Sequence, residues 1–426
     1  MNPIRYVRDG YRWLVNPYGL LDDAIARWGL TFRIRLPVLG DVLMTGDPRL
    51  LAEIAAHKDL DGGKAVTGLR NILGTRSLIM LDGEAHAARH RLIAPLFRGQ
   101  GLLAYDELTV RVTREVLSRL PDRRTFSMYS VLRRIGLKIM VAAMFGEGEH
   151  VQEAEEIVER FLHSFQSPAL LFFRPLQVDA GPWSLWGRAI GNRRALCDLI
   201  RRQMHAGGRG TILARLVAEA GASPTLDEED IIEEVLSLLM FGHDTAAATM
   251  AWAFAHIYRD SALVERIRVE AAEDRNVDSL AFLKACIQES MRLCPVVVHL
   301  ARTASADLRL GDFEVRRGQK VIPCTYLAQH NAEVFPEPNV YRPERFLNGQ
   351  HYEHAYFPFG FGNRTCVGKP FAMRQMLLVI ATTVQCADLE LAAGYQLMPT
   401  RQLVLIVPRG GTLMYKSALL LRSGIS

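Results

Sequence analysis

Hydrophobic and polar residues alternate near the start of the chain and then change to a helical spacing. Residues 32–36 alternate as a half-buried strand does, and a second short apolar run follows at residues 42–44. From about residue 84 to residue 292 the apolar positions recur mostly at helical spacing, with interruptions by glycine and proline. The pattern predicts a small sheet followed by a stack of helices.

Strand-like patterns return in the last third of the chain. Residues 300–323 are typical of short strands with tight turns, and a helix is predicted after residue 370. The chain contains neither an internal repeat nor a linker-like shift in composition. We therefore expect one domain over residues 1–426 that is mainly α with minor β-structure, with β-rich parts at about 30–60 and 295–350.

One long apolar helix is predicted over residues 229–259, and it carries polar residues in its middle. Gly242 and Asp244 are locally unfavourable there, since glycine costs roughly 1 kcal/mol relative to alanine and a buried carboxylate needs partners. Thr245 can donate a hydrogen bond to the carbonyl of Phe241, which would bend the helix and open a groove. Ordinary core packing is the alternative, but such local conflicts often mark functional sites.

Composition narrows the functional classes. The formal net charge is +5, and the arginine pairs are scattered along the chain, so nucleic-acid binding is not expected. The six cysteines form no CxxC pair, which argues against a zinc site or a disulfide framework. The first residues lack the apolar run of a signal peptide or membrane anchor, so we expect a cytoplasmic protein. Neither a dinucleotide fingerprint nor a phosphate-binding loop is present, so any electrons must come from another protein.

A glycine-rich loop near residue 360 presents a cysteine just before a predicted helix. Glycines let a backbone approach a planar cofactor, and amides at a helix start can lower a thiol pKa. An isolated cysteine is usually a buried, inert thiol. Here the spacing F-x-x-G-x-R-x-C-x-G resembles the haem-binding loop of the cytochrome P-450 family, and each fixed position is filled. These positions are Phe359, Gly362, Arg364, Cys366 and Gly368.

Two further segments strengthen this resemblance. Glu289 and Arg292 form an E-x-x-R pair on one helix face, and Arg345 lies in a proline-rich segment similar to the family's meander. The resemblance implies that these three residues brace the fold in a buried network and do no chemistry. It also implies the cytochrome P-450 fold, a helical bundle around haem with small β-sheets.

The cofactor implied by the resemblance is haem b, with the thiolate of Cys366 as the axial ligand of the iron. The two haem propionates need cationic or donor partners when buried. By resemblance these partners are His86, His90, Arg302 and Arg364. The family commonly has arginine where this chain has His90, so a donor is kept there without a permanent charge.

The activity implied by the resemblance is insertion of one oxygen atom of O2 into a lipophilic small molecule by hydroxylation or epoxidation. Asp244 and Thr245 would relay protons. Substrate contacts would include Phe241, Val297 and His299, although plain core packing also predicts apolar residues in these segments. Phe241 departs from the family pattern, since alanine or glycine usually stands there, and this leaves the shape of the pocket open.

Electrons would come from a ferredoxin or flavodoxin with its NAD(P)H-dependent reductase. The resemblance places several basic residues on the proximal side of the haem, where they suit an acidic partner; solvated charges without a partner are the alternative. These residues are Arg89, Arg91, Arg98, Lys369 and Arg374.

Two other functions stay open at this point. A haem-thiolate isomerase or dehydratase would use neither O2 nor a reductase, and such members often lose the acid-threonine pair that this chain keeps at Asp244 and Thr245. A haem-binding sensor or carrier would have no need of that pair, and steady turnover with a surrogate reductase would exclude it.

Overall fold

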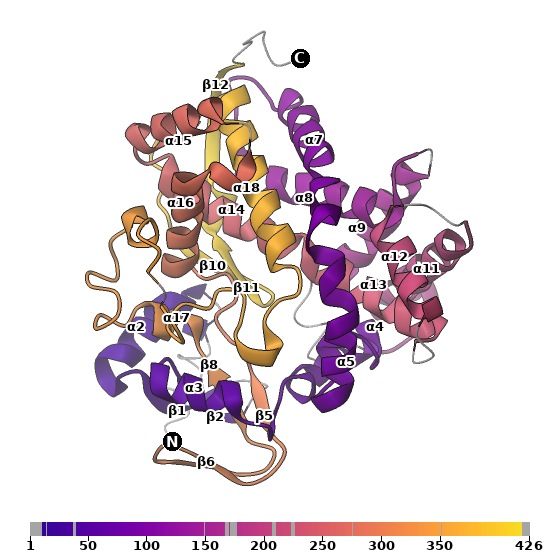
Figure 1. The fold of residues 1–426 in the computed structure, drawn as a ribbon, viewed down its shortest axis with the longest axis vertical. Coiled ribbons are helices and arrows are strands. Elements are labelled where there is room, and N and C mark those ends of the chain that lie inside the picture. Colours follow the sequence, from indigo (N-terminus) through magenta and orange to yellow (C-terminus); the bar gives the residue numbers. More distant parts are fainter. Residues whose placement is uncertain are drawn as a thin grey trace.

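A computed structural model describes residues 11–419, apart from positions 14, 37–39, 149, 167–169, 171–176, 207–209, 223–225, 275 and 351. Helices dominate the described residues, and the sheets are small (Figure 1). The predicted fold class, mainly α with minor β, is confirmed. The helices of the first half are α2 (Pro17–Trp28), α3 (Pro48–Ala56), α4 (Arg70–Leu73), α5 (Gly83–Ile93), α6 (Gln100–Leu103), α7 (Asp106–Ser118), α8 (Met128–Phe145) and α9 (Val151–Ser164).

The second half supplies the helices that surround the candidate site. They are α11 (Leu185–Ala206), α12 (Ile212–Ala222), α13 (Glu228–Gly242), α14 (Asp244–Ile257), α15 (Ser261–Glu273), α16 (Ala281–Leu293), α17 (Thr325–Gln329) and α18 (Lys369–Cys386). In the described part of the chain, no helix combines the length and apolar composition needed to cross a membrane.

The largest sheet is five-stranded and lies together with α2, α3 and α17, at the lower left of Figure 1. Phe32 pairs with Met44 in its antiparallel hairpin, and both side chains are buried, as the sequence alternation predicts. The strand order is β1 (Thr31–Leu36), β2 (Gly40–Thr45), β8 (Lys320–Pro323), β5 (Arg302–Ala304) and β3 (Leu60–Asp61).

The other strands form three smaller sheets, two of them built mainly from the last forty or so described residues. The sequence pattern also predicts strands near residues 403–407 and 413–416, and two of these C-terminal strands lie there. The first small sheet pairs β6 (Leu308–Leu310) with β7 (Phe313–Val315), and the second pairs β10 (Pro399–Gln402) with β11 (Leu405–Pro408). In the third, β12 (Leu413–Leu419) lies between β4 (Thr125–Ser127) and β9 (Ala387–Leu391).

The long helix predicted over residues 229–259 is divided in two at His243. Asp227 begins α13 with a capping box. The Asp227 side chain accepts a hydrogen bond from the Asp230 amide, and the Asp230 side chain accepts one from the Asp227 amide. All residues of α14 from Ala246 to Ile257 are buried, against α8, α16 and β11. The division therefore lies at the centre of the molecule.

Close packing of α8 explains the glycine at this division. A Cβ atom on Gly242 would lie 2.3 Å from Cε of Met140, which projects from α8. A larger residue there would force the end of the flexible Met140 side chain to move, so glycine at this position allows a close contact between the two helices.

Candidate active site

The cysteine loop crosses from the sheet region to the start of α18. The Cys366 amide donates to the Phe359 carbonyl (2.8 Å), and this bond closes the loop on itself. Gly362 adopts a left-handed φ of 62°, and a Cβ there would come within 3.3 Å of the Ala55 carbonyl oxygen. Gly368 is the residue before α18. The loop thus presents Cys366 at the N-terminus of a helix.

The sulfur of Cys366 is open to solvent although protein surrounds most of it. Burial raises the pKa of the Cys366 thiol, while the amides of Gly368 and Lys369 and the Lys369 ammonium oppose that rise. The amides lower the thiol pKa, as the sequence predicts, but burial has the larger effect.

Four nitrogen-bearing side chains gather beside this loop. His86 and His90 lie one turn apart on α5, with ring centroids separated by 6.0 Å. Burial, then the charges of Arg364, His90 and Arg302, lower the pKa of His86 to about 4. Burial, then the charge of Arg364, lower the pKa of Arg302 to about 10. Asp82 forms an ion pair with Arg364.

This cluster fits a dianionic cofactor. Arg302 and Arg364 are both partly buried. The charge of Asp82 raises the pKa of each, and Asp61 raises that of Arg364 as well. Two haem propionates would supply the missing negative charge and would also accept hydrogen bonds from the histidines. The residues predicted from the family resemblance are therefore brought together in a form that suits haem.

A largely apolar cavity of about 90 Å³ lies where α13 meets α14. Thr245 donates to the Phe241 carbonyl (2.9 Å), as the sequence predicts, and both residues line the cavity. The helix is therefore bent at the polar cluster. The other lining residues are Leu69, Arg133, Leu162, Phe165, Gln166, Met240, His243, Asp244, Gln402, Leu403, Val404 and Leu405.

Asp244 is held by α8. Tyr129 donates its hydroxyl hydrogen to Oδ1 of Asp244 (2.7 Å), and Nε of Arg133 lies 2.8 Å from the same oxygen in an ion pair. Burial, then the Asp244 charge, raise the pKa of Tyr129, so this hydroxyl stays a donor. Neither α8 residue follows from a sequence motif, because more than a hundred residues separate them from Asp244.

Two of the three predicted substrate contacts do not line this cavity. Phe241 does, but Val297 and His299 are absent from its lining. The carbonyl of Val297 accepts from the Thr325 hydroxyl (2.6 Å). The ring of His299 packs on Trp13, with centroids 4.2 Å apart.

Glu289, Arg292 and Arg345 form a buried ion network behind the cysteine loop. Arg292 binds Glu289 through two nitrogens, at 2.7 and 2.9 Å, and both side chains are fully buried. Arg345 reaches the same carboxylate at 3.3 Å. Arg292 also donates to the carbonyls of Gln329 (2.9 Å) and Pro338 (2.8 Å), so the pair fastens α16 to the proline-rich segment.

The basic face expected for a redox partner is smaller than predicted. Arg89 is 9% exposed and forms ion pairs with Asp230 and Glu234, so it fastens α5 to α13. Arg374 pairs with two carboxylates, those of Asp106 and Asp278. The exposed basic residues that remain from the predicted set are Arg91, which pairs with the exposed Glu84, Arg98 and Lys369.

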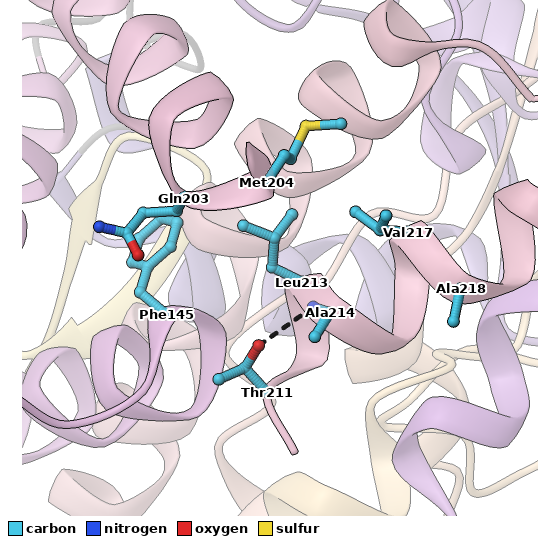
Figure 2. Close-up of a pocket in the computed structure, with 8 residues that line it drawn as sticks. All are labelled: Phe145, Gln203, Met204, Thr211, Leu213, Ala214, Val217 and Ala218. Atoms are coloured by element: carbon cyan, nitrogen blue, oxygen red, sulfur yellow. Dashed lines mark hydrogen bonds between the residues drawn. The ribbon is translucent and has the colours of Figure 1, made fainter. Parts of the chain in front are cut away.

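A second hollow, of about 190 Å³, lies away from this chemistry (Figure 2). It is lined by residues of α8, α11 and α12 together with Thr211, whose hydroxyl oxygen accepts from the Ala214 amide (3.0 Å). The lining carries no ionisable side chain. It therefore lacks the groups that catalysis or ion binding requires.

Comparison with known proteins agrees with a haem-thiolate class of enzyme. The family model described as "Cytochrome P450" matches residues 40–414. The chain belongs to the cytochrome P450 family, whose members hold haem through a cysteine thiolate and act as monooxygenases.

Relatives span nearly the whole chain. Cytochrome P450 137 of Mycobacterium tuberculosis is 29% identical over 400 residues, which cover 91% of this chain and 83% of the relative. Cytochrome P450 138 of Mycobacterium bovis is 28% identical over 395 residues, or 89% of this chain and 87% of the relative.

Solved structures share the fold. Retinoic acid bound cyanobacterial CYP120A1 matches with a TM-score of 0.82 at 21% identity over 95% of both chains. The cytochrome P450DA heme domain matches with a TM-score of 0.80 at 19% identity, over 94% of this chain and 92% of that one. The predicted P450 fold is confirmed.

Proposed function

We propose that this protein inserts one oxygen atom of O2 into a lipophilic small molecule, by hydroxylation or epoxidation. The observation that carries this proposal is the cavity at the bend between α13 and α14, where apolar side chains surround the polar pair Asp244 and Thr245. Such a cavity is suited to an apolar substrate with a source of protons beside it.

Haem b would be held by Cys366 on one side and by the cluster of His86, His90, Arg302 and Arg364 at its propionates. When bound, it supplies the activation of O2, and its thiolate ligand favours O–O cleavage. Phe359, Gly362 and Gly368 would shape the loop so that its backbone can lie close to the planar cofactor.

The protein's own contribution is to position protons and substrate. Thr245 holds its hydroxyl at the bend through the Phe241 carbonyl, and Asp244 is kept in place by Tyr129. The two groups would pass protons to the reacting oxygen. Phe241 would set the space that the substrate can fill.

Electrons would come from a ferredoxin or flavodoxin with its NAD(P)H-dependent reductase. Arg91, Arg98 and Lys369 are exposed and suit an acidic partner. Mutual charge attraction would chiefly raise the rate of association, so reduction should slow as ionic strength rises.

Two measurements test the proposal. The reduced carbon monoxide complex should show the red-shifted Soret band of thiolate ligation, and Cys366→His should lose it. A thiolate spectrum retained in Cys366→Ala would disprove the ligand assignment.

The second measurement separates the enzyme from its alternatives. With a surrogate reductase, Thr245→Ala should still bind substrate yet divert electrons into hydrogen peroxide, with product formation reduced by ~10²-fold or more. Thr249→Ala is the matched control, because this residue makes the same bond one turn later on α14, to the Thr245 carbonyl (2.9 Å). Product formed without O2 consumption would indicate an isomerase or dehydratase. Absence of any turnover would indicate a sensor or carrier.

A further inference from the structure

Two solvent-shielded nitrogen atoms near the β10–β11 hairpin have no hydrogen-bond partner among the described residues. They are Nη1 of Arg401 and Nε2 of His299. Unpaired buried donors are rare in folded proteins, since each forfeits its hydrogen bonds to water. A pair of them in one place suits an acceptor that the described residues do not supply.

Both side chains meet at the ring of Trp13. The His299 ring lies 4.2 Å from it, centroid to centroid, and the guanidinium carbon of Arg401 lies 4.9 Å from its centroid. Burial, then the charge of Arg401, lower the pKa of His299 well below its usual value, so this imidazole is neutral. Trp13 itself is 7% exposed, so its indole ring is packed together with the His299 imidazole and the Arg401 guanidinium.

Among the residues that the structure describes, no carboxylate balances the charge of Arg401. Its Nε donates to the Leu403 carbonyl (3.0 Å), which is a neutral acceptor. Burial alone lowers the pKa of Arg401 to about 10, with no opposing contribution from an acid. The Trp13 ring takes only the face of the guanidinium, so the in-plane N–H groups of the unpaired Nη1 can donate to a carboxylate.

Neither Arg401 nor His299 lines the cavity of the candidate active site, but Arg401 directly precedes the hairpin residues that do. β10 runs from Arg401 directly into Gln402, and residues 402–405 line the cavity beside Thr245. The amide of Ile406 donates to the Val296 carbonyl (2.9 Å), so the hairpin is fastened to the segment that carries His299. A molecule whose apolar part lies along the hairpin tip could therefore place a polar end at Arg401.

We infer that the substrate is a lipophilic carboxylic acid, whose carboxylate binds Arg401 Nη1 and His299 Nε2 while its apolar part extends along residues 402–405 toward Thr245. This inference rests on the proposed monooxygenase function. Anchoring one end of the substrate limits which of its carbons can lie beside Thr245, so the same two residues determine the site of oxidation.

Binding measurements on the haem-loaded protein test this directly. The probes are decanoic, dodecanoic, tetradecanoic and hexadecanoic acids, each paired with the alcohol of the same chain length, at a mildly alkaline pH where the acids are ionised. The wild type should bind at least one acid about tenfold more tightly than its alcohol, because a charge-assisted hydrogen bond is lost in the alcohol. No preference for any acid, or no binding of any acid, overturns the inference.

Variants separate recognition from packing. Arg401→Gln should weaken binding of the preferred acid about tenfold or more and leave the alcohol within about twofold. His299→Phe keeps a ring on Trp13 without the Nε2 donor and should show a smaller loss of the same kind. Arg409→Gln, at an exposed arginine just after β11, is the control and should change neither. Equal losses for acid and alcohol in Arg401→Gln would show a purely structural role and overturn the inference.

A turnover assay distinguishes this inference from the proposed function. If the acid preference depends on Arg401 but no bound acid is oxidised with a surrogate reductase, recognition stands and the monooxygenase proposal fails. If acids and alcohols are oxidised alike by the wild type and by Arg401→Gln, the proposal stands and the inference fails.

Discussion

Replacing Phe241 by alanine tests whether its ring sets the size of the active-site cavity. The ring lines a cavity of only about 90 Å³ and is half-buried, with its packed side against the main hydrophobic core. Truncating a fully packed phenylalanine costs about 3–5 kcal/mol. Since one side of this ring already faces open space, we expect a loss of about 1–3 kcal/mol for Phe241→Ala.

The assay combines stability with selectivity. We expect Phe241→Ala to melt a few degrees lower, to bind bulkier ligands than the wild type, and to change which carbon is oxidised. Leu239→Ala is the matched control, because Leu239 lies on the same helix, is fully buried and does not line the cavity. It should lose stability, by about 2–5 kcal/mol, without a change in ligand preference. An unchanged product pattern in a destabilised Phe241→Ala would refute the pocket-filling role.

Three further substitutions follow from the contacts. Arg292→Leu should abolish folding or haem retention, whereas Arg345→Leu should cost less, because Arg292 still pairs with Glu289 through two nitrogens; equal losses in chemical denaturation would contradict this. Burial raises the pKa of Glu234 from its usual 4.5 to about 7, so its contribution to stability is present below pH ~4.5 and declines as the pH rises through about 7. As the pH rises over that range, the free energy of unfolding of Glu234→Gln should therefore increase relative to that of the wild type, by up to about 3 kcal/mol in urea unfolding. A stability difference that stays constant with pH would exclude this role for Glu234. Tyr129→Phe should lower the fraction of electrons that reach product while substrate affinity stays the same, and a parallel loss of affinity would contradict a role in proton delivery alone.

Local features of the chain were predictable from the sequence. The alternation over residues 32–36 reports a strand with one buried face, and the bond from Thr245 to the Phe241 carbonyl follows from i, i+4 geometry in a helix. The cysteine loop could be recognised because its spacing is fixed within ten residues. Each of these depends on neighbours in the chain.

Contacts between distant segments were not predictable in the same way. Arg89 was expected on a surface for a redox partner, but it is buried against Asp230 and Glu234, about 140 residues further along. No pattern within α5 reveals this, since an arginine on a helix is usually solvated. The meeting of Arg401 with Trp13, at opposite ends of the chain, is of the same kind.

The candidate site divides its tasks between elements that are far apart in sequence. Thr245 is positioned by its own helix, through the carbonyl one turn earlier, whereas Asp244 is positioned by Tyr129 on α8. Gly242, two residues before Asp244, leaves room for the end of the Met140 side chain, which also projects from α8. The residue that weakens the helix therefore stands where α8 packs closely against it. A locally unfavourable residue in this helix thus marks a close contact with a segment that is distant in sequence.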